Sequence, residues 1–134
     1  MVLRLFSGFL LILLLTGCQT LSERRQSESL QEVLRKYEGV IRWGGVDQAS
    51  QFQRPGAMRE AGASSASTEE TRVTHYEVIQ GPSLVEENRA IQTAIIQYVF
   101  VNSQVVREIV NQQTWEFDPE SGNWYLISPL PTIK

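Results

Sequence analysis

Residues 29–43 have the hydrophobic periodicity of an amphipathic helix. Their apolar side chains recur three or four positions apart and so form one helical stripe: Leu30, Val33, Leu34, Tyr37 and Ile41. Ser29 followed by Glu32 fits a capping box, in which each side chain satisfies a free backbone donor at the helix start. Gly44 and Gly45 follow the stripe and predict its end. We therefore expect a helix over residues 29–43.

Residues 46–52 predict a second, short helix. Its apolar members fall on one side: Val46, Ala49 and Phe52. Asp47 lies in its first turn, where the helix dipole favours a negative charge, and Pro55 predicts its end. Residues 56–70 are rich in Gly, Ala and Ser and lack aromatic and β-branched aliphatic anchors, so we expect a flexible loop there.

From Arg72 the period changes to two, which predicts β-strands. We expect strands over residues 72–80, 89–101, 104–117 and 124–128, with turns at 81–83, 102–103 and 118–123. Residues 89–101 carry apolar side chains on both faces, which is typical of a central strand covered on both sides for part of its length. Two helices before four meandering antiparallel strands predict an α+β fold, with both helices packed on a curved, cone-like sheet.

The start of the chain follows a different pattern. Arg4 precedes a mostly apolar run over residues 5–15, about 16 Å long as a helix at ~1.5 Å per residue. A hydrocarbon core is about 30 Å thick, so this run is too short for a stable membrane span. A positive residue before a short apolar run instead matches a removable secretion signal.

The stretch Leu15-Thr16-Gly17-Cys18 follows this run and resembles the lipobox of bacterial lipoproteins. Gly17 is small enough for a peptidase to reach the bond after it, and the thiol of Cys18 can take a diacylglyceryl group as a thioether. The resemblance implies signal cleavage between Gly17 and Cys18 and a palmitate-type lipid anchor on Cys18, the chain's single cysteine. An ordinary secretion signal with a chance cysteine is the alternative.

Gln19, the residue after the cysteine, bears on the location of the anchor. In lipoproteins of enteric-type bacteria an Asp at this position implies retention in the inner membrane. The resemblance therefore implies the outer membrane, with the domain facing the periplasm. The periplasmic side of the inner membrane is the alternative.

Cleavage would divide the chain into a signal peptide (residues 1–17), a polar tether (residues 18–28) and one α+β domain (residues 29–134). Removing 17 of the 134 residues leaves 117, which suits one small domain and not two. The net charge is −3, and loss of Arg4 makes the mature chain one unit more negative. Without a basic excess, nucleic acid is not an expected partner.

The expected domain resembles the nuclear transport factor 2-like superfamily, also called cystatin-like α+β barrels. The stretches that carry the resemblance are residues 37–43, 46–52 and the terminal hairpin over 115–126. More narrowly, the domain resembles a group of small proteobacterial lipoproteins with no known activity, through its tail: Trp124, Leu126, Ser128, Leu130 and Pro131. The superfamily includes isomerases, dehydratases and pure binding modules, so the resemblance implies a fold and not one activity.

The residue types needed for catalysis or metal binding form no constellation in the sequence. His75 is the single histidine and neighbours no cluster of ligands, so we expect neither a metal site nor a cofactor. Asp47, Tyr37 and Tyr98 match, by residue type alone, the base and the oxyanion donors of the superfamily's isomerases. The position of Asp47 is better explained by the start of a helix.

Four aromatic residues are candidates for lining a ligand pocket: Tyr37, Trp43, Trp115 and Tyr125. The favoured interpretation of the tryptophans is a core between helix and sheet, because buried aromatic rings remove large areas from water. The polar run over residues 111–114 either lines the concave face of the sheet or marks an exposed stretch, and a polar interior would favour ligand binding.

These patterns lead us to expect a lipid-anchored cell-envelope protein whose small non-catalytic domain binds an envelope protein partner. The anchor would raise the effective concentration of the domain near membrane partners. One alternative is a small-molecule-binding protein, or an isomerase- or dehydratase-like enzyme, with a conical pocket. Another is a structural or assembly subunit that adds a strand to its sheet edge. The sequence leaves the oligomeric state and the partner open.

Overall fold

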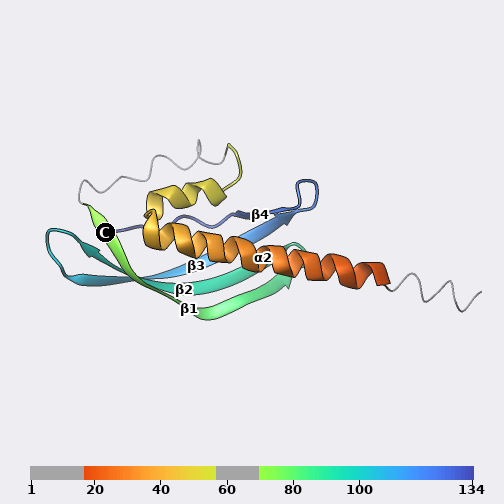
Figure 1. Cartoon of the computed structure of the whole chain (residues 1–134), viewed down its shortest axis with the longest axis horizontal. Helices are drawn as coiled ribbons and strands as arrows, with labels where there is room; N and C mark the ends of the chain where they lie inside the picture. The colour runs from red at the N-terminus through yellow and green to blue at the C-terminus, as the bar shows by residue number, and fades with distance from the viewer. Residues whose placement is uncertain (1–16, 57–69) are drawn as a thin grey trace, which may run out of the picture.

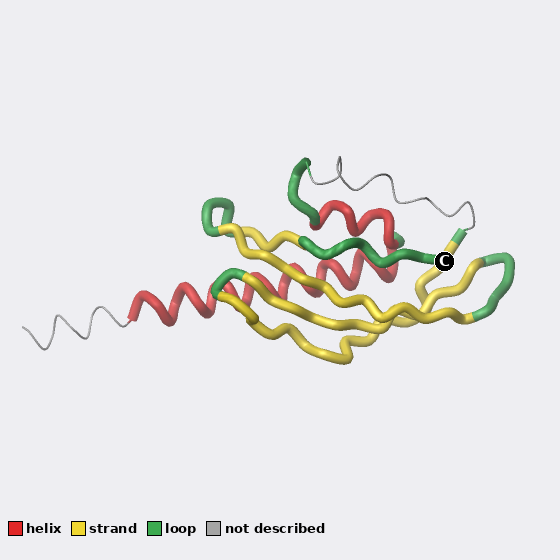
Figure 2. Tube along the Cα trace, turned by 180° about the vertical axis from the view of Figure 1, so that it is seen from behind, coloured by secondary structure: helices red, strands yellow, loops and turns green. Residues whose placement is uncertain are grey.

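The computed structural model describes residues 17–56 and 70–134. Its elements are α2 (Gly17–Trp43), the 3₁₀-helix η1 (Val46–Phe52) and strands β1 (Thr71–Glu86), β2 (Arg89–Phe100), β3 (Val106–Asp118) and β4 (Asn123–Leu126). The strands form one open antiparallel sheet in chain order. Helices α2 and η1 lie on the same side of it (Figures 1 and 2). This arrangement confirms the predicted α+β fold, with a long and a short helix packed on an open four-stranded antiparallel sheet.

Helix α2 begins at Gly17, so the predicted start at Ser29 is wrong. The hydroxyl of Ser29 donates to the carbonyl of Gln26 at 2.8 Å, inside the helix, instead of capping a terminus. Residues 18–28, expected to be the tether, include several good helix formers and no glycine or proline, so nothing local interrupts the helix. Figure 1 shows this N-terminal part of α2 extending past the end of the sheet.

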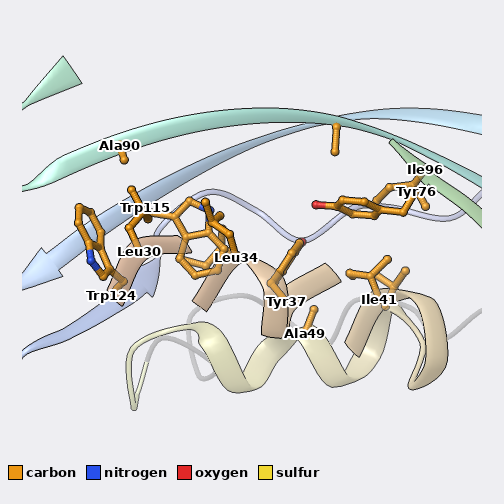
Figure 3. Close-up of a cluster of buried hydrophobic side chains, with 13 residues drawn as sticks. Leu30, Leu34, Tyr37, Ile41, Ala49, Tyr76, Ala90, Ile96, Trp115 and Trp124 are labelled. Carbon is orange, nitrogen blue, oxygen red and sulfur yellow. The ribbon is translucent and has the colours of Figure 1, made fainter. Parts of the chain in front are cut away.

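The predicted apolar stripe of α2 packs on the sheet. Leu30, Leu34, Tyr37 and Ile41 are all buried and join one hydrophobic core with side chains from η1 and the four strands (Figure 3). The helix ends at Trp43, as the two glycines after it predict, and Gly45 takes a positive φ of 89°.

The short helix η1 has the bounds predicted for it, although it is a 3₁₀-helix. Val46 and Ala49 are buried and Phe52 packs against the core, as the pattern indicates. Gln53 then pairs with Leu126 of β4, which ties the end of η1 to the sheet. Most of the loop expected over residues 56–70 lies outside the described residues.

Strand β1 continues to Glu86, so the turn predicted at residues 81–83 is wrong. Register shifts against β2 occur on both sides of Gly81 and Pro82, and the chain reverses at Glu87 and Asn88 instead. Proline lacks a backbone donor and is tolerated at irregularities of an edge strand, which is the position of Pro82 in β1.

Strand β2 is an inner strand whose two faces differ in burial. Ala90, Ala94 and Ile96 face the core and are fully buried, whereas Ile91 and Ile95 point the other way and are half-buried. Neither described helix covers that second face, so the expected covering on both sides is not found within residues 17–56 and 70–134 (Figure 2). The turns predicted near residues 102–103 and 118–123 are both present.

Candidate functional site

A polar layer lies inside the core, between α2 and the sheet. Its members are Tyr37, Tyr76, Gln92, Asn111 and Gln113, all buried. The side-chain amide of Gln113 donates to the Tyr76 hydroxyl at 2.8 Å and accepts from the indole of Trp115 at 3.3 Å. The amide of Gln92 donates to the same oxygen of Gln113 at 3.4 Å. The polar run in β3 therefore faces the concave side at its odd positions, one of the two alternatives that its sequence allows.

The two tyrosines of the polar layer resist ionisation. Burial raises the pKa of Tyr37 strongly, and the nearby Tyr76 raises it further. Burial also raises the pKa of Tyr76, against the opposing effect of its hydrogen bond from Gln113. Both phenols are therefore neutral near pH 7, and with neutral amides beside them the layer offers hydrogen bonds and no charged base.

Tyr37 and Trp115, two of the four candidate pocket residues, form the packed centre of the core. Both are fully buried, with ring centroids 5.3 Å apart in an edge-to-face arrangement. The ring of Phe52 completes a triangle, 5.4 Å from Tyr37 and 6.0 Å from Trp115. Figure 3 shows the labelled side chains of Tyr37 and Trp115 between the helices and the sheet. The core interpretation is confirmed for these two residues.

Trp43 and Tyr125, the other two candidates, lie elsewhere. Trp43 is 85% exposed at the end of α2, with the guanidinium of Arg42 over its ring, so both its pocket and its core interpretations are wrong. Tyr125 is half-buried and lies under the guanidinium of Arg54, at 5.5 Å. The structure therefore does not bring the four residues together.

The residues considered for acid–base chemistry also lie apart. Asp47 is exposed in the first turn of η1, and the hydroxyl of Tyr98 donates to the Lys134 carbonyl at 2.8 Å. His75 is exposed on β1, with its Nε2 3.7 Å from a carboxylate oxygen of Glu77. Among the described residues, no three His, Cys, Asp or Glu side chains gather where they would hold a metal ion.

An open groove of about 670 Å³ lies beside the N-terminal half of α2. Gln26 is one of its lining residues: its side-chain amide donates to the Glu87 carbonyl at 3.2 Å, and its backbone carbonyl accepts from the Trp124 indole at 3.2 Å. The groove is lined by Glu23, Arg24, Gln26, Ser27, Leu30, Gln31, Pro82, Leu84, Glu87 and Trp124. This lining mixes charged, neutral polar and apolar side chains, so its chemistry singles out no ligand class.

The outer sheet face is the side of the sheet that points away from α2 and η1. Its apolar members are Ile91, Ile95, Val99, Val106 and Val110. Val106 and Val110 are 60% and 64% exposed. The sequence signals this surface through the second apolar face of residues 89–101, but it does not show that the face stays uncovered.

Cys18, the candidate lipid attachment residue, is the second residue of α2. The N-terminal part of α2 extends past the end of the sheet (Figure 1), and residues 1–16 lie outside the described residues. In the described ranges, no helix is both long and apolar enough to cross a membrane.

Comparisons with known protein families, with curated proteins and with solved structures found no match.

Proposed function

We propose that the chain is a bacterial lipoprotein, with a small interaction domain that a lipid on Cys18 holds at the periplasmic face of the outer membrane. The observation that carries the proposal is the sequence of Arg4, a short apolar run and Leu15-Thr16-Gly17-Cys18, in that order. A small residue before a cysteine, directly after an apolar run too short to span, is the context in which a lipobox functions.

The position of Cys18 in α2 supports this proposal. Gln26, whose side-chain amide donates to the Glu87 carbonyl of the hairpin between β1 and β2, lies about 12 Å along the axis from Cys18 at ~1.5 Å per residue. An acyl group at Cys18 would therefore enter a bilayer without displacing any core side chain. The core residues begin with Leu30, still further from the bilayer.

The packing of the core favours an interaction domain over a conical pocket. Tyr37, Phe52 and Trp115 fill the space between helix and sheet where a ligand would have to sit. The polar groups beside them already bond one another and are neutral. The domain would therefore meet a partner through its surface. The resemblance to the nuclear transport factor 2-like superfamily stays a prediction.

Metabolic labelling with radiolabelled fatty acid tests the anchor. We expect the full chain to incorporate label and to lose its signal, because the Cys18 thiol accepts the diacylglyceryl group before cleavage. The variant Cys18→Ser should incorporate no label and should keep its full leader. On membrane fractionation, the labelled protein should follow the outer-membrane fraction.

A matched control separates lipid attachment at Cys18 from the mere presence of a thiol. Cys18→Ser combined with Thr20→Cys restores one cysteine two positions along, outside the lipobox, and should stay unlabelled. An unlabelled wild-type chain that fractionates as free protein would overturn the proposed anchor.

Crosslinking in intact envelopes tests whether the domain contacts an envelope protein. A catalytic turnover specific to the wild-type chain would overturn the proposed non-catalytic role of the domain.

A further inference from the structure

The outer sheet face exposes several large aliphatic side chains to solvent. Ile95 of β2 pairs directly with Val110 of β3, and Val99 pairs with Val106, with the polar pair Gln97 and Glu108 between these two apolar pairs on the same face. Val106 and Val110 remain 60% and 64% exposed. Strands with apolar side chains on both faces normally have both faces covered, and the described helices cover one.

The area of this face suits a second copy of the same chain. Strand β2 has 12 residues. At ~3.4 Å per residue it is about 40 Å long, and three strands at ~4.8 Å spacing give roughly 600 Å². Two such faces together would bury roughly 1,200 Å², the lower end of the range for specific protein–protein interfaces. Tethering of both copies to one membrane would add effective concentration.

The proposed anchor restricts how two copies can meet. Face-to-face copies related by a two-fold axis parallel to β2 keep their strands, and hence their α2 helices, pointing the same way. Helix α2 runs along the sheet (Figure 1), so both Cys18 ends would then emerge at the same end and reach one bilayer. An in-plane axis perpendicular to β2 would place the two anchors at opposite ends of the dimer.

Polar groups on the outer sheet face complement one another under this axis. His75 on β1, Gln97 on β2 and Glu108 on β3 form one lateral row. Rotation about an axis along β2 places β1 of one copy over β3 of the other. The imidazole of His75 would then face the carboxylate of Glu108 of the partner subunit, on both sides of the axis.

We propose that the outer sheet face is the interface of a two-fold homodimer on the membrane, with its axis parallel to β2. The inference rests on the proposed lipid anchor for the direction of the axis. The sheets would pack in the aligned manner, about 10 Å apart, with Ile95 on the axis opposite its own copy.

Cysteine crosslinking of the full chain in intact cells tests the interface. Ile95→Cys should be joined into a dimer by a short bismaleimide, because the two thiols would face each other across the axis at a separation too large for a direct disulfide but within reach of the reagent. Glu28→Cys, on the exposed side of α2, is the control and should stay monomeric. The absence of a dimer for Ile95→Cys would overturn the proposed interface.

A second pair of cysteines tests the direction of the axis. An axis along β2 places Gln97 opposite its own copy, so Gln97→Cys should crosslink to itself. An axis perpendicular to β2 through Ile95 would place Gln97 opposite Thr93 instead. A dimer that forms between Gln97→Cys and Thr93→Cys chains, with none from Gln97→Cys alone, would overturn the parallel axis.

Charge substitutions at Val110 give an independent readout. The row of Ile95 contains Glu77 and Val110 on its two sides, so Val110 would face Glu77 of the partner subunit. Val110→Glu should weaken dimerisation by about tenfold or more through like-charge repulsion, and Val110→Lys should weaken it less. Equal dimerisation by the wild type and both variants, measured in detergent by sedimentation, would contradict the interface.

The wild-type lane of the crosslinking experiment separates the two proposals. An acylated Cys18 has no free thiol and should give no band. A wild-type chain that crosslinks or reacts with a thiol reagent shows that the anchor proposal fails. A dimer specific to Ile95→Cys in the same experiment would still support the interface.

Discussion

The amide and phenol side chains of the polar layer are buried between α2 and the sheet. Gln113 is fully buried and satisfied by Tyr76, Gln92 and Trp115. The alternation of β3 indicates that Gln113 shares a face with Trp115, but its partner Tyr76 lies 37 positions away on another strand. Partners so distant in sequence leave no local pattern, so the burial of a glutamine was not predictable.

Alkaline pH should test the tyrosines of the polar layer. Tyrosine ionises at about pH 10 in the unfolded chain, and burial raises the folded pKa of Tyr37 and Tyr76 above that value. Their contribution to the free energy of unfolding is therefore complete below pH 10 and is lost as the pH rises above it. Each group contributes a slope of up to about 1.4 kcal/mol per pH unit.

Urea unfolding at about pH 9 to 11 provides the measurement, with Tyr37→Phe as the variant. We expect the stability of Tyr37→Phe to fall less steeply with pH than that of the wild type. At neutral pH the same variant should lose about 1 kcal/mol with its hydrogen bond to Asn111, which is a long one at 3.5 Å. Parallel declines for both proteins would contradict the role of Tyr37.

Individual elements were predictable to different degrees, for reasons that the structure makes plain. Residues 46–52 have glycine before them and proline after them, and η1 has those bounds. The predicted start of α2 was wrong because Ser29 and Glu32 have the spacing of a capping box although they lie inside the helix. The residues before Ser29 already favour a helix. Strand β1 was cut short because the Gly-Pro pair that usually marks a turn here lies in an irregular edge strand.

Two glycines in different elements should respond to alanine in opposite directions. Gly39 lies within α2, where an added Cβ meets nothing within 4 Å, so Gly39→Ala should stabilise the protein by about 0.5–1 kcal/mol. Gly122 has equal space but takes a φ of +70° in the turn before β4, so Gly122→Ala should destabilise it by about 1 kcal/mol. Urea unfolding of the two variants is the measurement, and a shift of the same sign in both would contradict this account.

At the scale of the whole molecule, both layers depend on one core. The core cluster draws side chains from α2, from η1 and from each of the four strands. Neither the helix nor the open sheet buries its apolar face without the other. The sequence predicts this two-layer arrangement through its periodicities. That neither described helix covers the outer sheet face was not predictable, because it depends on how elements distant in sequence pack.

A shared core predicts a single unfolding transition. Helix content, followed by circular dichroism, and the fluorescence of the buried Trp115 and Trp124 should change together in urea. Trp43 is 85% exposed, so Trp43→Phe should remove background fluorescence with little change in stability. Two separated transitions would show that α2 and the sheet are independent units.

The extension of α2 past the sheet has a mechanical consequence. One continuous helix joins Cys18 to the core. With the proposed lipid on Cys18, this helix would act as a stiff arm whose length sets the height of the domain above the bilayer. Each residue inserted before Gln26 would raise the domain by about 1.5 Å and swivel it by about 100° around the arm. The height of the domain and its rotation about the helix axis therefore change together. An insertion of about two full turns would lengthen the arm while nearly preserving the direction that the outer sheet face points.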